Sequence, residues 1–185
     1  DELLGKIASG EDVALVSDAG TPTISDPGFA LVRAALERGM KVSPVPGPSA
    51  LIAALSVSGL PTDEFLFAGF LPRTSGARRT RLLRLKPQTA TLIFYESPHR
   101  VLESLADMIA VLGDRFAFLA REVTKIHEEF LTGTAESLLV SVEQPKGEYV
   151  IVVAPEAEPA AASAQADPEP ATMFSEFCRL TDFEG

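Results

Sequence analysis

The chain has 185 residues, of which 46% are apolar and 23% charged, a composition ordinary for a globular protein of one or two domains. A single cysteine, Cys178, excludes an internal disulfide framework and suits a reducing cytoplasm. No apolar run of about 18 residues predicts a transmembrane helix. The net charge of −10, taken whole, argues against a nucleic-acid-binding protein.

The charge is unevenly distributed along the sequence. Residues 155–185 contain seven acidic side chains and one basic one, so they carry −6. Residues 73–86 contain no acidic side chain and six basic ones: Arg73, Arg78, Arg79, Arg81, Arg84 and Lys86. The average therefore conceals an acidic tail and a basic segment that could contact phosphates, although a solvated helical face would have the same composition.

Short apolar runs alternate with amphipathic stretches, a pattern that predicts an α/β fold. In the first part of the chain we expect two strands and three helices. In order, these are a helix end over residues 1–8, a strand over 13–17, a helix with Asp26 as N-cap and Pro27 in its first turn, a strand over 41–45 and a helix over 50–57.

The run Gly59-Leu60-Pro61-Thr62 predicts a domain boundary, which gives a first domain over 1–60 and a second over 61–154. Residues 155–172, rich in Ala, Pro and Glu, are expected to be disordered, and 173–183 to form a short helix. In the second domain we expect strands over 65–71, 91–95, 116–121, 128–131 and 149–153, with helices over the basic segment, from the Ser97-Pro98 cap to Leu112, and near 134–142.

Two loops of the first domain each follow a predicted strand and precede a predicted helix. They are residues 17–28, S-D-A-G-T-P-T-I-S-D-P-G, and residues 44–50, P-V-P-G-P-S-A. Ligands of open α/β sheets bind at the carboxyl ends of strands, where such loops meet. Neither loop has a nucleotide-phosphate fingerprint, and tight structural turns are the alternative interpretation.

Two segments of the second domain concentrate acids, bases and both histidines, which proton transfer requires. They are Y-E-S-P-H-R over 95–100 and A-R-E-V-T-K-I-H-E-E over 120–129, and a solvated rim is the alternative. A metal could be held by His99, His127, Glu128 and Glu129, but no metal-binding spacing supports such a site, so no metal is expected.

Six runs occur here in one order: S-D-A-G-T-P-T-I-S-D-P-G, P-V-P-G-P-S-A-L-I-A-A-L, F-L-P-R, T-L-I-F-Y-E-S-P-H-R, A-R-E-V-T-K-I-H-E-E-F and K-G-E-Y-V-I-V-V. Over about residues 1–154 they closely resemble the ribosomal RNA small subunit methyltransferase I family of the tetrapyrrole methylase superfamily. The resemblance implies two α/β domains, S-adenosylmethionine in the cleft between them, and 2′-O-methylation of a cytidine ribose in 16S rRNA of the small subunit's decoding region. It further implies a cytoplasmic homodimer without membrane attachment, and a first domain incomplete at its N-terminus.

The resemblance also suggests which residues form the site. Thr21 replaces an acidic residue of the superfamily pattern, so no ionic role transfers to it, while the Asp18 carboxylate would favour a sulfonium. The cofactor-binding candidates are Asp18, Ala19, Gly20, Thr21, Ile24, Ser49, Ala50, Tyr95, Glu96 and Gly133.

A ribose hydroxyl is a weak acid, so a base must remove its proton or a cation must stabilise the developing oxyanion. Lys125 is the first candidate, followed by Glu122, Glu96 and His99, and an ion-pair network joining two motifs is the alternative. The six basic residues and Arg100 are the RNA-binding candidates. A tetrapyrrole-type small-molecule methyltransferase and a non-catalytic remnant of the rRNA enzyme stay open, and a generic nucleotide-phosphate binder is the weakest alternative.

Overall fold

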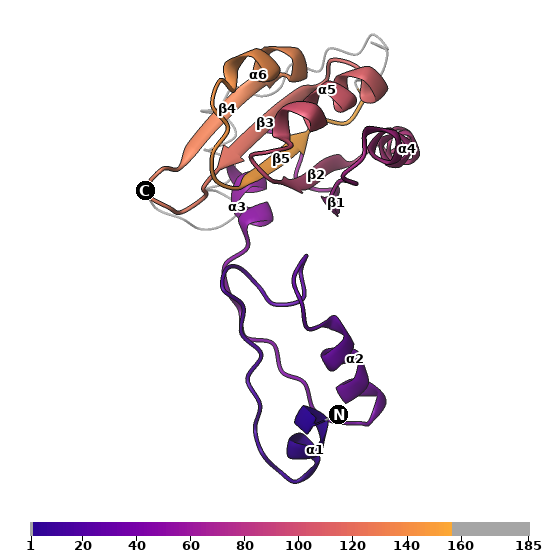
Figure 1. Cartoon of the computed structure of the whole chain (residues 1–185), viewed down its shortest axis with the longest axis vertical. Helices are drawn as coiled ribbons and strands as arrows, with labels where there is room; N and C mark the ends of the chain where they lie inside the picture. The colour runs from indigo at the N-terminus through magenta and orange to yellow at the C-terminus, as the bar shows by residue number, and fades with distance from the viewer. Residues whose placement is uncertain (1, 157–185) are drawn as a thin grey trace, which may run out of the picture.

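The computed structural model describes residues 2–156 (Figure 1). Helices and strands alternate in the second half of this range, as an α/β chain requires. The elements are α1 (Glu2–Ala8), α2 (Phe29–Glu37), α3 (Ala50–Val57), β1 (Phe65–Phe70), α4 (Ser75–Leu85), β2 (Thr91–Glu96), α5 (Val101–Leu112), β3 (Phe116–Arg121), β4 (Glu129–Thr134), α6 (Ala135–Ser141) and β5 (Tyr149–Val153). The α/β class predicted from the sequence is confirmed.

The five strands form one mixed sheet in the order β1-β2-β5-β3-β4. Strands β1 and β2 are parallel, and the other three neighbouring pairs are antiparallel. The register aligns Glu96 with Tyr149, Tyr149 with Arg121, and Arg121 with Glu129. The carboxyl ends of β2 and β3 therefore lie at the same edge of the sheet.

Helices cover both faces of the sheet, because the central strands are apolar on both sides. Leu92 and Phe94 pack with α4, α5 and α6 in the larger core. Ile93, Phe118 and Val152 point the other way and pack against Leu51, Ala54 and Leu55 of α3. Helix α3 thus joins the residues that precede it to the sheet (Figure 1).

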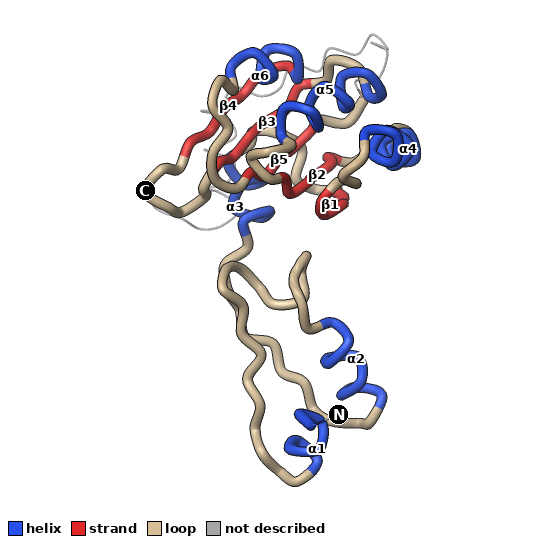
Figure 2. The backbone as a smooth tube through the Cα atoms, in the orientation of Figure 1, coloured by secondary structure: helices blue, strands red, loops and turns tan. Residues whose placement is uncertain are grey.

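The strands predicted over residues 13–17 and 41–45 are wrong for the structure described. Both segments are loop (Figure 2), and neither takes part in the sheet. Val16 is 82% exposed and Val45 86%, although both are β-branched and apolar. Such a run becomes a strand only where a neighbouring strand completes its hydrogen bonds, and among residues 2–156 these two segments have no such neighbour.

Two predicted helix starts also need correction. Helix α2 begins at Phe29 with Gly28 as its N-cap, at φ 120°, a conformation that glycine adopts readily and Asp26 would not. Residues 97–100 form a turn before α5, in which the amide of Val101 donates to the Ser97 carbonyl at 3.1 Å. The expected disorder over 155–172 falls mostly, and the helix over 173–183 wholly, outside the described residues. Within residues 2–156, no helix has the length and apolarity to cross a bilayer.

Candidate functional site

The two loops singled out in the first domain lie against each other. The Thr21 hydroxyl donates to the Pro48 carbonyl at 2.9 Å, although 27 residues separate them. Gly20 has φ +73°, and a Cβ there would lie 4.0 Å from the same carbonyl. The loop also turns locally, since the Ser17 hydroxyl bonds the Ala19 carbonyl at 2.9 Å. The expectation that both loops meet is confirmed.

Helix α3 brings these loops to the five-stranded sheet. Its N-cap is Ser49, whose side chain makes no capping hydrogen bond, so the first amides of the helix are not capped by it. Next to them, the Leu51 backbone lies close to the Tyr95 hydroxyl. Burial raises the pKa of Tyr95, the nearby Leu51 backbone opposes this, and the Glu148 charge raises it further. Ala50 and Tyr95 both pack against the core cluster that α3 forms with the sheet.

An aromatic cluster on β1 and β2 lies at this junction. The Tyr95 ring meets Phe67 at a centroid distance of 4.8 Å and Phe70 at 5.8 Å, both edge to face. Phe70 is 52% exposed. The first loop reaches the same strand, because a Cβ on Gly69 would lie 3.3 Å from the Ser25 hydroxyl oxygen. Apolar ring surface, loop backbone and a helix N-terminus therefore meet in one place.

Backbone strain is concentrated in two of the segments that the sequence singled out. Within the described range, the non-glycine residues with positive φ are Thr23 and Ser25 in the first loop, and Glu122 and Thr124 after β3. Such conformations cost about 1–3 kcal/mol each and persist where the surroundings impose them, often at functional sites. The distribution supports a functional role for both loops.

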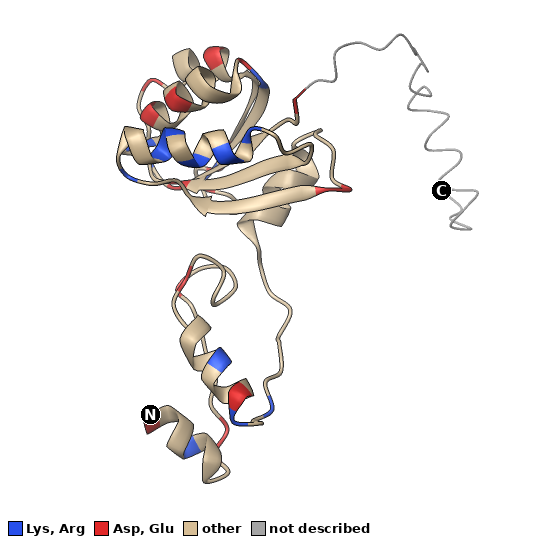
Figure 3. Cartoon of the chain, turned by 90° about the vertical axis from the view of Figure 1, so that its right-hand side faces the viewer, with Lys and Arg blue, Asp and Glu red and all other residues tan. Residues whose placement is uncertain are grey.

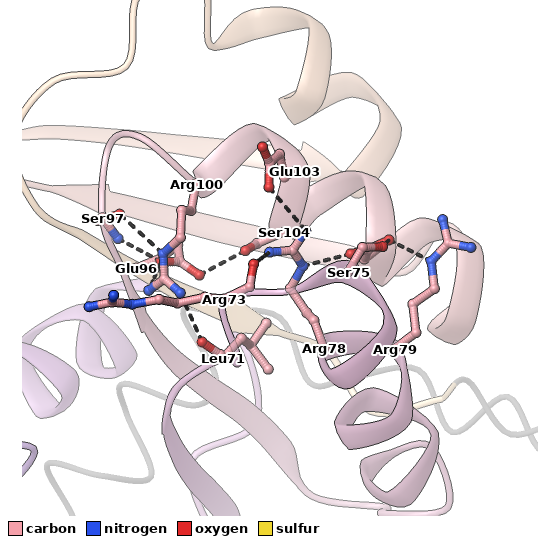
Figure 4. A network of polar contacts seen from close by, with 11 residues as sticks. Leu71, Arg73, Ser75, Arg78, Arg79, Glu96, Ser97, Arg100, Glu103 and Ser104 are labelled. Atoms are coloured by element: carbon pink, nitrogen blue, oxygen red, sulfur yellow. Dashed lines mark hydrogen bonds and ion pairs between the residues drawn. The ribbon is translucent and has the colours of Figure 1, made fainter.

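Glu96 is not an accessible carboxylate, which corrects its assignment as a catalytic and cofactor-binding side chain. It lies on the face of β2 that packs against α5, and the residue is 1% exposed. Its oxygens accept hydrogen bonds from the Ser97 amide at 2.8 Å and the Ser104 hydroxyl at 2.7 Å, and Arg100 lies 2.6 Å away (Figure 4). These contacts to Ser97, Arg100 and Ser104 show that the Glu96 side chain fixes the turn that follows β2.

Arg100 is largely committed to the same network. Besides the Glu96 pair, it donates to the Leu71 carbonyl at 3.0 Å, and its side chain is only 20% exposed. Its predicted contact with RNA would have to use the remaining part of the guanidinium. Arg100 thereby ties the end of β1 to the turn after β2 (Figure 4).

Lys125 and Glu122 form an ion-pair cluster at the end of β3. The Lys125 ammonium lies 2.9 Å from Glu122 and 3.0 Å from Glu148. The hydrogen bonds to these two carboxylates raise the pKa of Lys125, and the Lys125 bond, followed by the Glu148 amide, lowers the pKa of Glu122. Lys125 is therefore a cation at neutral pH, which removes it as a general base and leaves it as an electrostatic stabiliser.

Gly147 makes room for this cluster. It has φ +70°, and a Cβ at this position would overlap the Glu122 side chain. Beside it lies a solvent-open hollow of about 410 Å³, lined by Arg121, Glu122, His127, Gln144, Lys146 and Gly147. His127 and His99 are both exposed and lie at the same sheet edge as Lys125. The described residues contain no group of three or more side chains placed to hold a metal ion.

Gly133 lies far from the junction, which contradicts its cofactor assignment. It pairs with Ala117, which aligns through Val153 with Leu92. This row is at the opposite edge of the sheet from Tyr95, and β4 is three strands away from β2. Gly133 lies far from Tyr95 because of the strand order, which a glycine turn in the sequence cannot reveal.

The basic segment forms α4, but its cations are not equivalent (Figure 3). Arg78 is 2% exposed and lies 2.6 Å from Asp107, so its assignment to RNA binding is wrong. Arg79 is half exposed and also contacts Asp107 at 2.6 Å. Burial alone would raise the pKa of Asp107, but hydrogen bonds from Arg79, Arg78 and Ser75 together hold it below its usual value. Arg73, Arg81, Arg84 and Lys86 are exposed and, unlike the exposed Arg79, make no ion pair with Asp107.

The remaining first-loop candidates, Asp18, Ala19 and Ile24, are exposed. Sequence reasoning missed Asp107 and Glu148. The signal for Glu148 was present, since it lies within the K-G-E-Y-V run already singled out. Asp107 had no local signal, because its partners are 28 and 29 residues away on another helix.

Known proteins resemble this chain over most of its length. The ribosomal RNA small subunit methyltransferase I of Xylella fastidiosa strain Temecula1 is 56% identical over 158 residues, covering 83% of this chain and 58% of the relative. The protein of the same name from Mesorhizobium japonicum is 52% identical over 176 residues, covering 93% of this chain and 58% of the relative. The chain thus spans just under three fifths of the length of these two relatives.

Solved structures share the fold at lower sequence identity. The methyltransferase CobJ superposes with a TM-score of 0.64 at 21% identity, covering 84% of this chain and 70% of CobJ. A uroporphyrin-III C-methyltransferase from Thermus thermophilus, solved with S-adenosylhomocysteine, gives 0.57 at 18% identity, covering 83% and 70%. The family model described as Tetrapyrrole (Corrin/Porphyrin) Methylases matches residues 3–139. The chain therefore belongs to the tetrapyrrole methylase family.

Proposed function

We propose that this chain acts as an S-adenosylmethionine-dependent methyltransferase on small-subunit ribosomal RNA. The observation that carries the proposal is the 56% identity over 158 residues to a protein named for that activity. The finer proposal is methylation of the 2′-hydroxyl of a cytidine ribose in the 16S rRNA of the decoding region. A cytoplasmic homodimer is part of the same proposal.

The junction of the first loop, α3 and Tyr95 fits S-adenosylmethionine. The uncapped amides at the start of α3 suit the carboxylate of its amino-acid part. The rings of Tyr95 and Phe70 suit a flat base, and Gly20 allows close approach of a ligand to the backbone. We propose Gly20, Thr21, Ser49, Ala50 and the Tyr95 ring as the residues that hold it, without Gly133.

When bound, S-adenosylmethionine would supply an electrophilic methyl group for in-line displacement by a hydroxyl oxygen. The contribution of the protein is then mainly positioning, which is worth up to about 7–11 kcal/mol in favourable cases. The hydrogen bond between Thr21 and Pro48 holds the two loops in a fixed relation to each other. Such preorganisation lowers the entropy lost on binding.

Lys125 is proposed to stabilise negative charge as it develops on the ribose oxygen. Its ammonium has two carboxylate partners and stays protonated at neutral pH. Glu122 is a weak base, since its pKa is lowered. His99, which is exposed at the same sheet edge, is proposed as the group that accepts the proton.

The test is methyl transfer from S-adenosylmethionine carrying a labelled methyl group. Purified small ribosomal subunits that lack the modification are the acceptor, and a uroporphyrinogen is the competing small molecule. Nucleoside mass spectrometry should then find label in 2′-O-methylcytidine. Label on the tetrapyrrole alone would favour the small-molecule enzyme, and cofactor binding with no transfer to either acceptor would favour the non-catalytic alternative.

A further inference from the structure

The outward surface of α4 carries cations that the described protein leaves without partners. Arg73, Arg81, Arg84 and Lys86 are exposed, and none has an ion pair with another residue in the range 2–156. Arg78 and Arg79, by contrast, are both held by Asp107. Arg81, Arg84 and the C-cap residue Lys86, together with the exposed Leu83, are called the basic α4 face below, whereas Arg73 precedes the helix. Leu83 is 59% exposed, so the face combines positive charge with one apolar side chain.

The acidic end of the sequence begins beside this face. The Ala154 amide donates to the Phe116 carbonyl at 2.9 Å, and the Glu156 carboxylate lies 3.1 Å from the Arg115 guanidinium. Arg115 is almost buried, and it also donates to the Lys86 carbonyl at 3.4 Å. Glu156, the last described residue, therefore lies near the carboxyl end of α4, because its partner Arg115 also contacts the Lys86 carbonyl.

The segment that follows complements the basic α4 face in composition. Residues 157–185 contain six acidic side chains and one basic one, so they carry −5. They also contain Met173, Phe174, Phe177, Leu180 and Phe183, which could cover Leu83. Asp167 lies 11 positions after Glu156, a stretch that spans at most about 40 Å, whereas the 11 residues of α4 span only about 16 Å. Every cation of the face is within reach.

We infer that residues 157–185 bind the basic α4 face of their own chain. The tether sets a local concentration of the acidic segment on the order of millimolar, so weak individual ion pairs suffice for substantial occupancy. The consequence for RNA rests on the proposed function. RNA phosphates must displace the acidic segment from the basic α4 face, so the segment weakens the binding of isolated RNA. It thereby favours acceptors in which phosphates are densely packed. The docking itself does not depend on RNA or on methyl transfer.

A single site-specific label tests the docking. Cys178 is the sole cysteine of the sequence, so a nitroxide can be attached there without other substitutions. In low salt, the amide signals of residues 75–86 should broaden relative to the reduced, diamagnetic sample. In about 1 M salt, where the screening length is about 3 Å, the broadening should disappear. Unbroadened α4 signals at low salt would overturn the inference.

Two controls separate docking to α4 from other encounters. Arg81→Glu with Arg84→Glu should abolish the broadening, whereas Lys6→Glu with Arg33→Glu, two exposed cations on α1 and α2, should preserve it. Contacts between copies are measured in a mixture of two samples. One is isotope-labelled and carries no nitroxide, and the other carries the nitroxide at natural isotope abundance. Broadening of α4 in that mixture to the same extent would assign the face to a second copy and overturn the intramolecular inference.

An RNA-binding measurement tests the competition. Neutralising the acids at 158, 167, 169, 176, 182 and 184 to their amides should tighten binding of a small-subunit RNA fragment by about three- to tenfold at low salt. The gain should vanish in the Arg81→Glu, Arg84→Glu background. Equal affinities of the parent and neutralised chains would overturn the competition. If RNA does not bind at all, the proposed function fails while the spin-label result stands.

Discussion

At the scale of single residues, the chain uses its charged side chains in two different ways. Glu96, Arg78 and Asp107 are nearly inaccessible, and their partners are side chains and backbone of the same domain. Lys125 and Glu122 pair at the surface, beside a solvent-open hollow. Buried pairs hold elements together, whereas accessible ones can meet a ligand.

The buried pair gives a stability prediction. Asp107→Ala leaves the Arg78 guanidinium buried without its main partner and should lower the free energy of unfolding by about 3 kcal/mol at pH 7. Replacing both, as Arg78→Met with Asp107→Leu, should cost less, because no charge stays buried. Urea unfolding followed by circular dichroism measures both. A smaller loss in Asp107→Ala than in the double variant would contradict this reading.

The same carboxylate predicts an acid limit. Because the pKa of Asp107 is lower in the folded state than its usual 3.8, its contribution is present at neutral pH. The contribution is lost as the pH falls from about 4 through the folded-state pKa. The stability difference between the parent chain and Asp107→Ala should therefore shrink below pH 4 and stay constant from pH 5 to 8. A stability difference between the two chains that grows as the pH falls below 4 would contradict this prediction.

Lys125 gives a prediction about rate. Lys125→Met should lower kcat for methyl transfer by about 100-fold with little change in KM, as expected for a lost stabiliser of developing charge. Glu148→Gln should change kcat by only a few-fold, because Glu122 still holds the ammonium. Lys125→Arg, which keeps a cation, should recover part of the loss. A kcat of Lys125→Met within twofold of the parent value would show that the cluster is only a structural ion-pair network.

At the scale of elements, α4 is amphipathic in charge as well as in hydropathy. Leu82, Leu85 and Arg78 face the core, and Arg78 is anchored there by α5. Arg81 and Arg84 face solvent. The sequence predicted the helix and its positive charge but could not reveal that one of its cations is internal, since Asp107 belongs to a helix about 30 residues further on.

The outward cations predict a salt dependence. Arg81→Ala with Arg84→Ala should weaken binding to single-stranded RNA and make the slope of log affinity against log salt shallower by about 1.4. Lys6→Ala with Arg33→Ala removes two exposed cations elsewhere and should leave the slope unchanged. The affinities come from fluorescence anisotropy at several salt concentrations. Equal slopes for the two double variants would exclude α4 from the RNA-binding surface.

At the scale of the whole molecule, local patterns predicted the second half well and the first half less well. Helix α3 over Ala50–Val57 and strands Phe116–Arg121 and Tyr149–Val153 lie where apolar periodicity put them. Residues 13–17 and 41–45 have equally β-like sequences but no ladder neighbour. The assignment of Gly133 to the cofactor site was wrong for a related reason, because strand order is a long-range property. Sequence motifs located the loops that meet, and only the fold showed which residues share the junction.

The functional site is proposed to lie where the first loop, α3 and Tyr95 meet. Hydrogen–deuterium exchange with and without S-adenosylmethionine tests it directly, because binding slows exchange only at the amides that it covers or orders. We predict protection over residues 19–25, 49–52 and 95, with none over 131–134 at the far edge of the sheet. Protection at 131–134 without any at 49–52 would contradict the account.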